Sequence, residues 1–139
     1  MKKEKKRRIE LTEHQLLLMA RCVEDVSRFL AGQTTLDNTR MHLFGQDGFY
    51  GELAKELKRI QPLVTPQLSI GASYGWSGSG CPNNVQSKAI AEAYYLYREI
   101  YHQTTIERAK DVDMECNVYL GETLRCKDSG EPIKIERIG

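Results

Sequence analysis

Three stretches of the chain repeat apolar residues at the three- and four-residue spacing of an amphipathic helix. The first covers about residues 13–31, where seven apolar positions fall on one face: Leu16, Met19, Ala20, Val23, Val26, Phe29 and Leu30. Thr12 and Gln15 have the spacing of a capping box, and Gly32 stands where a helix would end. The pattern predicts a long helix that buries this apolar face.

Two more helical patterns follow along the chain. "FYGELAKELKRI" (49–60) predicts a shorter helix that stops before Pro62, because the residue before a proline disfavours the helical conformation. The longest pattern runs from Asn84 to about Lys110, with six residues in its apolar stripe: Val85, Ala89, Ala93, Leu96, Ile100 and Ile106. Four tyrosines surround it and indicate more than one packing neighbour: Tyr94, Tyr95, Tyr97 and Tyr101. One neighbour could be a second copy of the chain, since tyrosine is enriched in interfaces.

The two ends of the chain alternate polar and apolar residues, as strands do. "RRIEL" (7–11) predicts a short strand, and residues 116–138 predict a strand followed by a hairpin that turns at "DSG". Residues 33–48 and 61–71 are expected to be a loop and an extended connection. We therefore predict an α+β fold, with two or three helices packed on a small antiparallel sheet in a single domain over residues 1–139.

Composition narrows the function classes. The 139 residues carry a formal net charge of +1, which argues against a protein that coats a nucleic-acid duplex. The segment "MKKEKKRR" is basic, and we expect residues 1–7 to be a flexible solvated terminus rather than a nucleic-acid arm. No apolar run reaches membrane-spanning length, and no hydrophobic segment follows the basic start as in a signal peptide. Four widely spaced cysteines indicate reduced thiols in a cytoplasmic protein: Cys22, Cys81, Cys116 and Cys126.

The segment "ASYGWSGSGCPNN" (72–84) has the parts of a nucleotide site. Its glycines and Asn83 and Asn84 precede the longest helix, where free backbone N–H groups favour phosphate, and Lys88 follows one turn in. Tyr74 and Trp76 could stack on a base. The alternative is an ordinary glycine-rich turn whose rings fold back on the core.

Two basic pairs are further candidates for phosphate contacts. Arg28 and Gln33 lie at the end of the first helix. Arg98 and His102 are four residues apart on the longest helix and so share a face, where the arginine could donate two bonds to a phosphate. Alternatively, Arg98 could pair with neighbouring glutamates and Arg28 with Glu24.

Catalytic patterns are missing from the sequence. There is no GxSxG motif, and the three histidines are too dispersed to predict a metal triad: His14, His42 and His102. The candidate residues suit binding better than chemistry. We therefore expect no enzymatic activity, no metal and no cofactor.

Three short motifs carry a family resemblance: "SRFLAGQ" at the end of the first helix, "ASYGW" in the glycine-rich loop and "YLYREIYH" on the tyrosine-rich helix. Together they resemble small proteins encoded by phages and mobile elements, and within that group the first Thoeris anti-defence family. Members of this family bind cyclic nucleotide signals of bacterial immunity, including cyclic ADP-ribose isomers and cyclic oligonucleotides, without degrading them. They assemble as dimers and higher oligomers with pockets at the subunit contacts.

The resemblance implies a role for several residues. Tyr74 would stack on a base, Asn84 would make a polar contact at the helix start, and Arg28 would contact phosphate in a second pocket. Just before His102, where the family has a basic residue, this chain has Tyr101, and Arg98 one turn earlier could compensate. The alternative function is that of a structural or interaction protein of a phage or mobile element, which uses its basic N-terminus to contact nucleic acid or a host partner.

Overall fold

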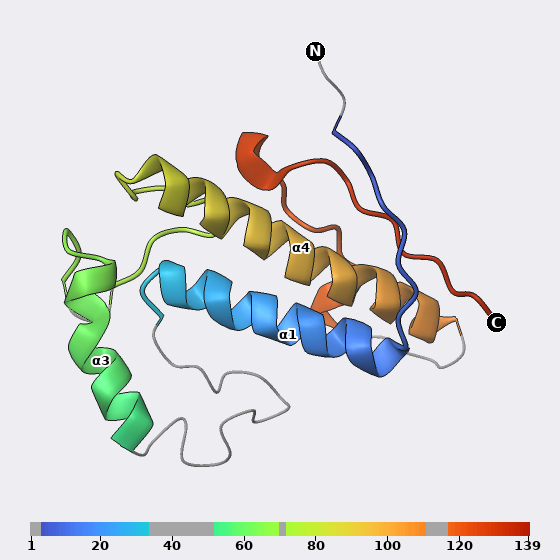
Figure 1. Ribbon diagram of the computed structural model, residues 1–139, viewed down its shortest axis with the longest axis horizontal. Helices are drawn as coiled ribbons and strands as arrows, with labels where there is room; N and C mark the ends of the chain where they lie inside the picture. Colours follow the sequence, from blue (N-terminus) through green and yellow to red (C-terminus); the bar gives the residue numbers. More distant parts are fainter. Residues whose placement is uncertain (1–3, 34–51, 70–71, 111–116) are drawn as a thin grey trace.

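The computed structural model describes residues 4–33, 52–69, 72–110 and 117–139, and Figure 1 shows their arrangement. Over these ranges the chain forms three α-helices: α1 (Glu13–Leu30), α3 (Glu52–Val64) and α4 (Asn84–Ala109). Two short 3-10 turns follow, η1 (Val118–Leu120) and η2 (Lys127–Ser129). α1 and α4 lie side by side in opposite directions, and α3 lies at the end where α1 stops and α4 begins (Figure 1). None of the helices in these ranges is long and apolar enough to cross a membrane.

α1 begins and ends as its sequence predicts. The Thr12 hydroxyl accepts a hydrogen bond from the Gln15 amide at 3.1 Å, and the Gln15 side chain accepts one from the Thr12 amide at 2.9 Å, which completes the capping box. Gly32 follows the helix with a φ of 103°, a conformation that glycine adopts readily. Ala20 is fully buried against α4, whereas Met19 and Val26, predicted to share its buried face, are exposed.

α4 also begins at the predicted residue. The Asn83 side chain accepts a hydrogen bond from the Gln86 amide at 3.1 Å, so it satisfies one of the free N–H groups of the first turn. Of the predicted stripe, Ile100 is buried, but Val85 is 80% exposed. Tyr95, Tyr97 and Tyr101 are buried instead. Their neighbours are α1 on one side and the C-terminal part of the chain on the other, so this chain supplies more than one neighbour for the tyrosines, as predicted.

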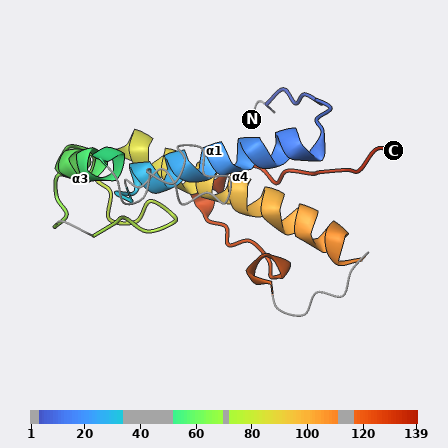
Figure 2. The same ribbon diagram turned by 90° about the horizontal axis from the view of Figure 1, so that it is seen from below.

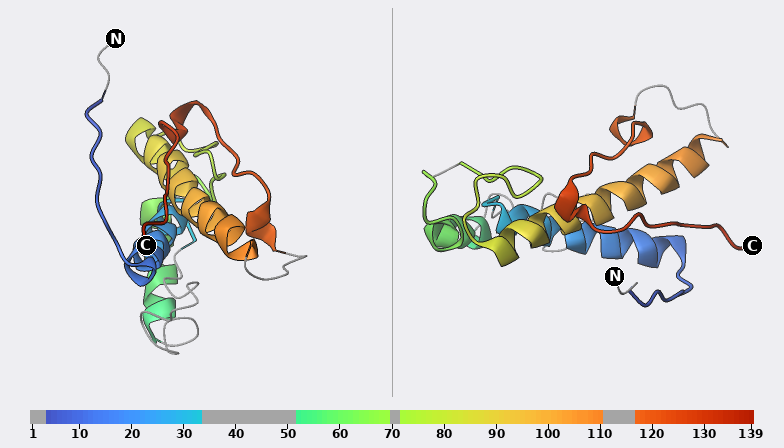
Figure 3. Two further views of the ribbon diagram at one scale, coloured as in Figure 1. Left: turned by 90° about the vertical axis from the view of Figure 1, so that its right-hand side faces the viewer. Right: turned by 90° about the horizontal axis from the view of Figure 1, so that it is seen from above.

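The core has two parts along the helix pair. The larger part lies between the middle of α1 and the C-terminal half of α4: Ala20, Tyr97, Ile100 and Tyr101, with Leu16, Leu17, Val23, Tyr94, Tyr119, Ile133 and Ile135 packed around them. The smaller part lies where the three helices meet: Ala31, Tyr74 and Ile90, with Leu30, Leu68 and Cys81. Beyond the larger part the two helices diverge toward the start of α1 and the end of α4 (Figures 2 and 3).

A single glutamine joins the ends of the three helices. Gln86, in the first turn of α4, donates from its side-chain amide to the Leu30 carbonyl at 2.7 Å and to the Val64 carbonyl at 3.1 Å. These carbonyls belong to the last residues of α1 and α3, where helices lack internal partners. Gln86 therefore caps two helices from a third.

α3 does not stop before Pro62, and that prediction is wrong. The helix contains Pro62 and ends at Val64. A proline near the end of a helix removes only one backbone hydrogen bond, and the helical bonding resumes after it, since the Thr65 amide donates to the Gln61 carbonyl at 2.9 Å. The capping bond from Gln86 to Val64 also stabilises this last turn.

The predicted sheet is absent from the described residues, so the α+β assignment is wrong and the fold of these ranges is helical. Residues 4–12 and 121–139 form no strand, and the turn η2 is the regular element within them. Side chains of α4 take the place of a partner strand. Gln103 donates to the Ile133 carbonyl at 2.9 Å and accepts from the Ile135 amide at 2.7 Å, and the Tyr95 hydroxyl accepts from the Ile133 amide at 3.1 Å. Ile133 and Ile135 face α4 while Lys134 is exposed, which explains the alternating pattern.

The loop predicted at 33–48 falls outside the described residues, apart from Gln33. The helix predicted at 49–60 is described only from Glu52 onward. Residues 61–69, predicted to be extended, complete α3 and then form turns. Cys116 and residues 1–3 also fall outside the description.

We expect Gln86→Ala to destabilise the protein by roughly 1–3 kcal/mol, because it leaves the Leu30 and Val64 carbonyls without their partner. The free energy of unfolding from urea titration measures this change. Lys88→Ala is the matched control, since Lys88 is exposed in the same turn. Equal stabilities for the two variants would contradict the capping role of Gln86.

Candidate functional site

The predicted nucleotide loop packs against the helices rather than opening to solvent. The Tyr74 ring is only 5% exposed and belongs to the smaller core. Its backbone amide donates to the Ala31 carbonyl at 2.8 Å, and its hydroxyl donates to the Gln67 side chain at 2.6 Å. Tyr74 therefore has no free ring face for a base, and in this conformation it is a core residue.

The glycines of this loop allow close packing on the start of α4. Gly78 has a φ of 78°, and a Cβ atom added there would overlap the Ser87 carbonyl. The Ser87 hydroxyl donates to the Gly78 carbonyl at 3.1 Å. Among the free N–H groups of the helix start, that of Gln86 is satisfied by the Asn83 side chain. Asn84 and Lys88 are exposed and take no part in these bonds.

Trp76 folds back onto α4, as the structural alternative for this ring predicts. Its ring centroid lies 5.2 Å from that of Tyr94, with an angle of 35° between the planes, and the side chain is half-buried. This contact begins a row of rings along α4. Tyr94 and Tyr97 are 5.5 Å apart, Tyr97 and Tyr101 are 6.0 Å apart, and Tyr101 and Tyr119 are 4.9 Å apart.

Arg98 lies against two rings of this row. Its guanidinium carbon is 5.8 Å from the centroid of Tyr94 and 4.8 Å from that of Tyr119, within the range of cation–π attraction. Arg98, Tyr94, Tyr119 and Trp76 are all half-buried. We call these four residues the Arg98 surface. Two of them, Trp76 and Arg98, were predicted site residues, and the Tyr94 ring joins them.

Arg28 is paired within the chain. Its Nε and one terminal nitrogen each lie 3.0 Å from Glu24 Oε2, and its other terminal nitrogen donates to the Gln33 side chain at 2.9 Å. The arginine side chain remains 34% exposed. The pairing with Glu24 is the structural alternative that the sequence allows, and it makes Gln33 a partner of Arg28.

Tyr101 and His102 hold neighbouring elements onto α4. The Tyr101 hydroxyl donates to Glu24 Oε1 at 3.0 Å, and burial together with the Glu24 charge raises the pKa of Tyr101. His102 Nδ1 lies 2.7 Å from the Tyr119 carbonyl, so this nitrogen carries the proton and donates. Arg98 and His102 share a face, as predicted, and both contact Tyr119.

The sequence alone missed two residues of this site. Tyr94 lies one turn before Arg98, and that four-residue spacing was a usable signal for stacking. Tyr119 was placed on a predicted strand, and no local pattern indicates that its ring returns to α4. Among the described ranges, no group of three or more His, Cys, Asp or Glu side chains could hold a metal ion.

Comparison with known proteins returns no relative. The chain matches no protein-family model, no curated protein and no solved structure.

We expect Gly78→Ala to destabilise the protein by at least about 2 kcal/mol more than Gly80→Ala. Both glycines have positive φ, so both variants carry the strain of a side chain in that region. Only at position 78 would the new Cβ overlap the Ser87 carbonyl, since at position 80 the nearest atom is a Tyr74 ring carbon at 3.6 Å. Thermal unfolding measures the difference. Equal losses would mean that the loop does not rest on α4 as described.

We expect Tyr97 to make stability fall at high pH. Burial raises the pKa of Tyr97 to about 12, with the Arg28 charge opposing and the Glu24 charge reinforcing the shift. The pKa of Tyr97 is higher in the folded protein than in the unfolded chain. The contribution of the protonated Tyr97 to stability is therefore complete below pH 10 and is lost as the pH rises toward 12. Between pH 7 and 11.5 the unfolding free energy of Tyr97→Phe should fall by roughly 2 kcal/mol less than that of the wild type. Urea unfolding at pH 7, 9 and 11.5 measures both declines. The same decline in both proteins would contradict the assignment.

Proposed function

We propose that this protein binds a cyclic nucleotide and sequesters it without chemical change. The observation that supports the proposal is the position of Arg98 over the rings of Tyr94 and Tyr119, at 5.8 Å and 4.8 Å. Trp76 extends the same surface through its contact with Tyr94. Aromatic rings attract bases at about 1–3 kcal/mol per stacked base, and a guanidinium attracts phosphate.

The N–H groups of Arg98 are free to bind an anion. Stacking occupies the flat face of the guanidinium and leaves its edge open. Among the described residues, no hydrogen bond or ion pair uses these N–H groups. An arginine edge can donate two parallel bonds to a phosphate, and the ring contacts already hold it in place.

Additional positive charge is available on both helices of the pair. Lys88 is exposed one turn into α4, and Arg28 is partly exposed near the end of α1. Arg28 already bonds to Glu24 and Gln33, so a phosphate there would compete with these partners. Arg98 is therefore the principal phosphate contact in this proposal, and Arg28 and Lys88 add long-range attraction.

The choice of a bacterial immune signal as ligand rests on the resemblance to the Thoeris anti-defence family. The same resemblance supports a dimer or larger homo-oligomer with pockets at subunit contacts. A half-buried surface such as the Arg98 surface covers only one side of a ligand, and a second copy would cover the other. Sequestration needs no reacting group, which agrees with a proposal of binding without catalysis.

A second candidate function uses the N-terminal segment. Residues 4–11 are all exposed and include Lys5, Lys6, Arg7 and Arg8. The ion pair between Lys6 and Glu131 is itself exposed, and exposed ion pairs contribute little to stability. These charges favour an interaction protein of a phage or mobile element that contacts nucleic acid or a host partner.

We expect Arg98→Ala to weaken cyclic nucleotide binding by roughly 10- to 100-fold, equivalent to about 1.4–2.8 kcal/mol, because both the stacked cation and the phosphate donors are lost. Trp76→Ala should weaken it less, since only one ring is removed. Isothermal titration calorimetry with cyclic ADP-ribose isomers and cyclic di- and trinucleotides measures the affinities. The ligand released from the wild-type protein by heating should have its original mass.

Arg125→Ala is the matched control, because Arg125 also stacks on a tyrosine, 5.0 Å from the Tyr95 ring, but outside the Arg98 surface. Its affinity should equal that of the wild type. Unchanged binding in Arg98→Ala would disprove the site, and a released ligand of altered mass would indicate an enzyme. Deletion of residues 1–7 should leave nucleotide binding intact; loss of a nucleic-acid or protein partner in that variant would favour the second candidate function.

A further inference from the structure

A small cavity lies between α1, α4 and η1, and Tyr119 of the Arg98 surface is one of the residues that line it. It has a volume of about 80 Å³. Eight residues line it, and most of them are polar: Leu17, Arg21, Tyr101, Thr104, Thr105, Arg108, Asn117 and Tyr119. One water needs roughly 10–15 Å³ measured in the same way, so the cavity has room for several waters or for one small polyatomic ion.

Arg21, one of the residues that line this cavity, has a donor atom without a hydrogen-bond partner among the described residues. Arg21 Nε is buried, and among the described residues it makes no hydrogen bond. The guanidinium lies over the Tyr101 ring, 5.6 Å from its centroid. A buried N–H group without an acceptor costs about 1–3 kcal/mol, so an acceptor within its reach would stabilise the protein.

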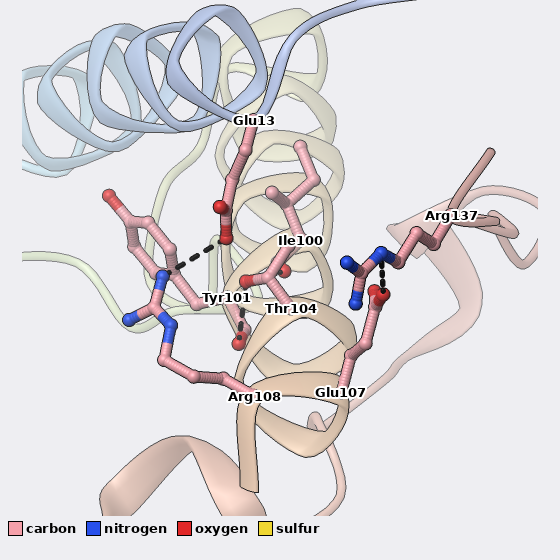
Figure 4. Close-up of polar contacts among 7 residues, drawn as sticks. All are labelled: Glu13, Ile100, Tyr101, Thr104, Glu107, Arg108 and Arg137. Carbon is pink, nitrogen blue, oxygen red and sulfur yellow. Dashed lines mark hydrogen bonds and ion pairs between the residues drawn. The ribbon is translucent and has the colours of Figure 1, made fainter. Parts of the chain in front are cut away.

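The other polar groups of the wall favour a negative occupant. Arg108 extends from the last turn of α4 on the same side as Tyr101 and donates to Glu13 with one terminal nitrogen at 3.1 Å (Figure 4). Thr105 and Asn117 add a hydroxyl and an amide to the wall. Two arginines therefore face a cavity whose wall contains no carboxylate among the described residues.

Two carboxylates of α1 are bonded to other residues of the chain. Glu24 accepts from the Tyr101 hydroxyl with one oxygen and from Arg28 with the other. Glu13 is bonded to Arg108 and lies at the more exposed end of the helix pair. Neither of these carboxylates is bonded to Arg21, so the Arg21 charge can attract an anion in the cavity.

From this cavity we infer a binding site for a tetrahedral oxyanion, either free phosphate or the terminal phosphate of a monoester. Its four oxygens match donors that converge from three elements: Arg21 from α1, Thr105 and Arg108 from α4, and Asn117 before η1. The small volume excludes a whole nucleotide. The site is independent of the proposed cyclic nucleotide site, although Tyr119 borders both.

The test measures phosphate binding to the full-length protein by calorimetry and by the rise in melting temperature. Inorganic phosphate, sulfate and adenosine monophosphate are compared with chloride at equal ionic strength. We expect the oxyanions, but not chloride, to raise the melting temperature, with a shift that grows with the logarithm of their concentration above the dissociation constant. Where the difference is lost in Arg21→Gln, tighter binding of the monophosphate than of phosphate identifies a monoester as the source, and the reverse identifies the free ion.

Arg21→Gln should weaken phosphate binding at least 10-fold, and Thr105→Val, which keeps the shape of the side chain, about three-fold or more. Arg125→Ala should bind phosphate as the wild type does, and Arg21→Gln should retain cyclic nucleotide binding. If Arg21→Gln fails to fold, Thr105→Val decides the question alone. Oxyanions that stabilise no more than chloride, or wild-type affinity in every folded cavity variant, would overturn the inference.

Discussion

The side-chain amide of Gln86 binds the ends of two helices from the first turn of a third, and the arrangement of the other elements follows from these bonds. Its donors reach the carbonyls of Leu30 and Val64, the last residues of α1 and α3. Because they fix where α1 stops relative to the start of α4, they set which residues of the two antiparallel helices face each other. The same junction holds the glycine-rich loop, whose Tyr74 amide bonds to Ala31 beside it.

This register divides the aromatic residues of α4 between the core and the proposed binding surface. Tyr97 and Tyr101 face α1 and fill the core, whereas Tyr94 stays half-buried beside Arg98. Tyr119 connects the two groups, since its ring contacts both Tyr101 and Arg98. The Arg98 surface is therefore held by the same ring row that packs the core, and little side-chain ordering remains to oppose ligand binding.

Local signals predicted α1 and the start of α4 closely, because Thr12 and Asn83 cap these helices with side chains that are visible in the sequence. The C-terminal strands were predicted from a real alternation of apolar and polar residues. In the structure this segment forms no strand and bonds instead to the Gln103 side chain, which lies 30 residues before the Ile133 carbonyl that it binds. No local pattern indicates such a contact. Tyr119 was missed for the same reason. Both failures concern contacts between distant parts of the chain, which periodicity does not describe.

The way in which Gln103 holds the C-terminal segment has a consequence for how the molecule opens. A strand ladder releases its bonds cooperatively, but residues 132–138 are held by a few separate bonds and by two half-buried isoleucines: Ile133 and Ile135. Such a segment can detach while α1 and α4 stay paired, at a free-energy cost well below that of global unfolding. Amide protons of this segment therefore exchange with solvent by sub-global opening, whereas those in the middle of α4 exchange only when the helix pair itself separates.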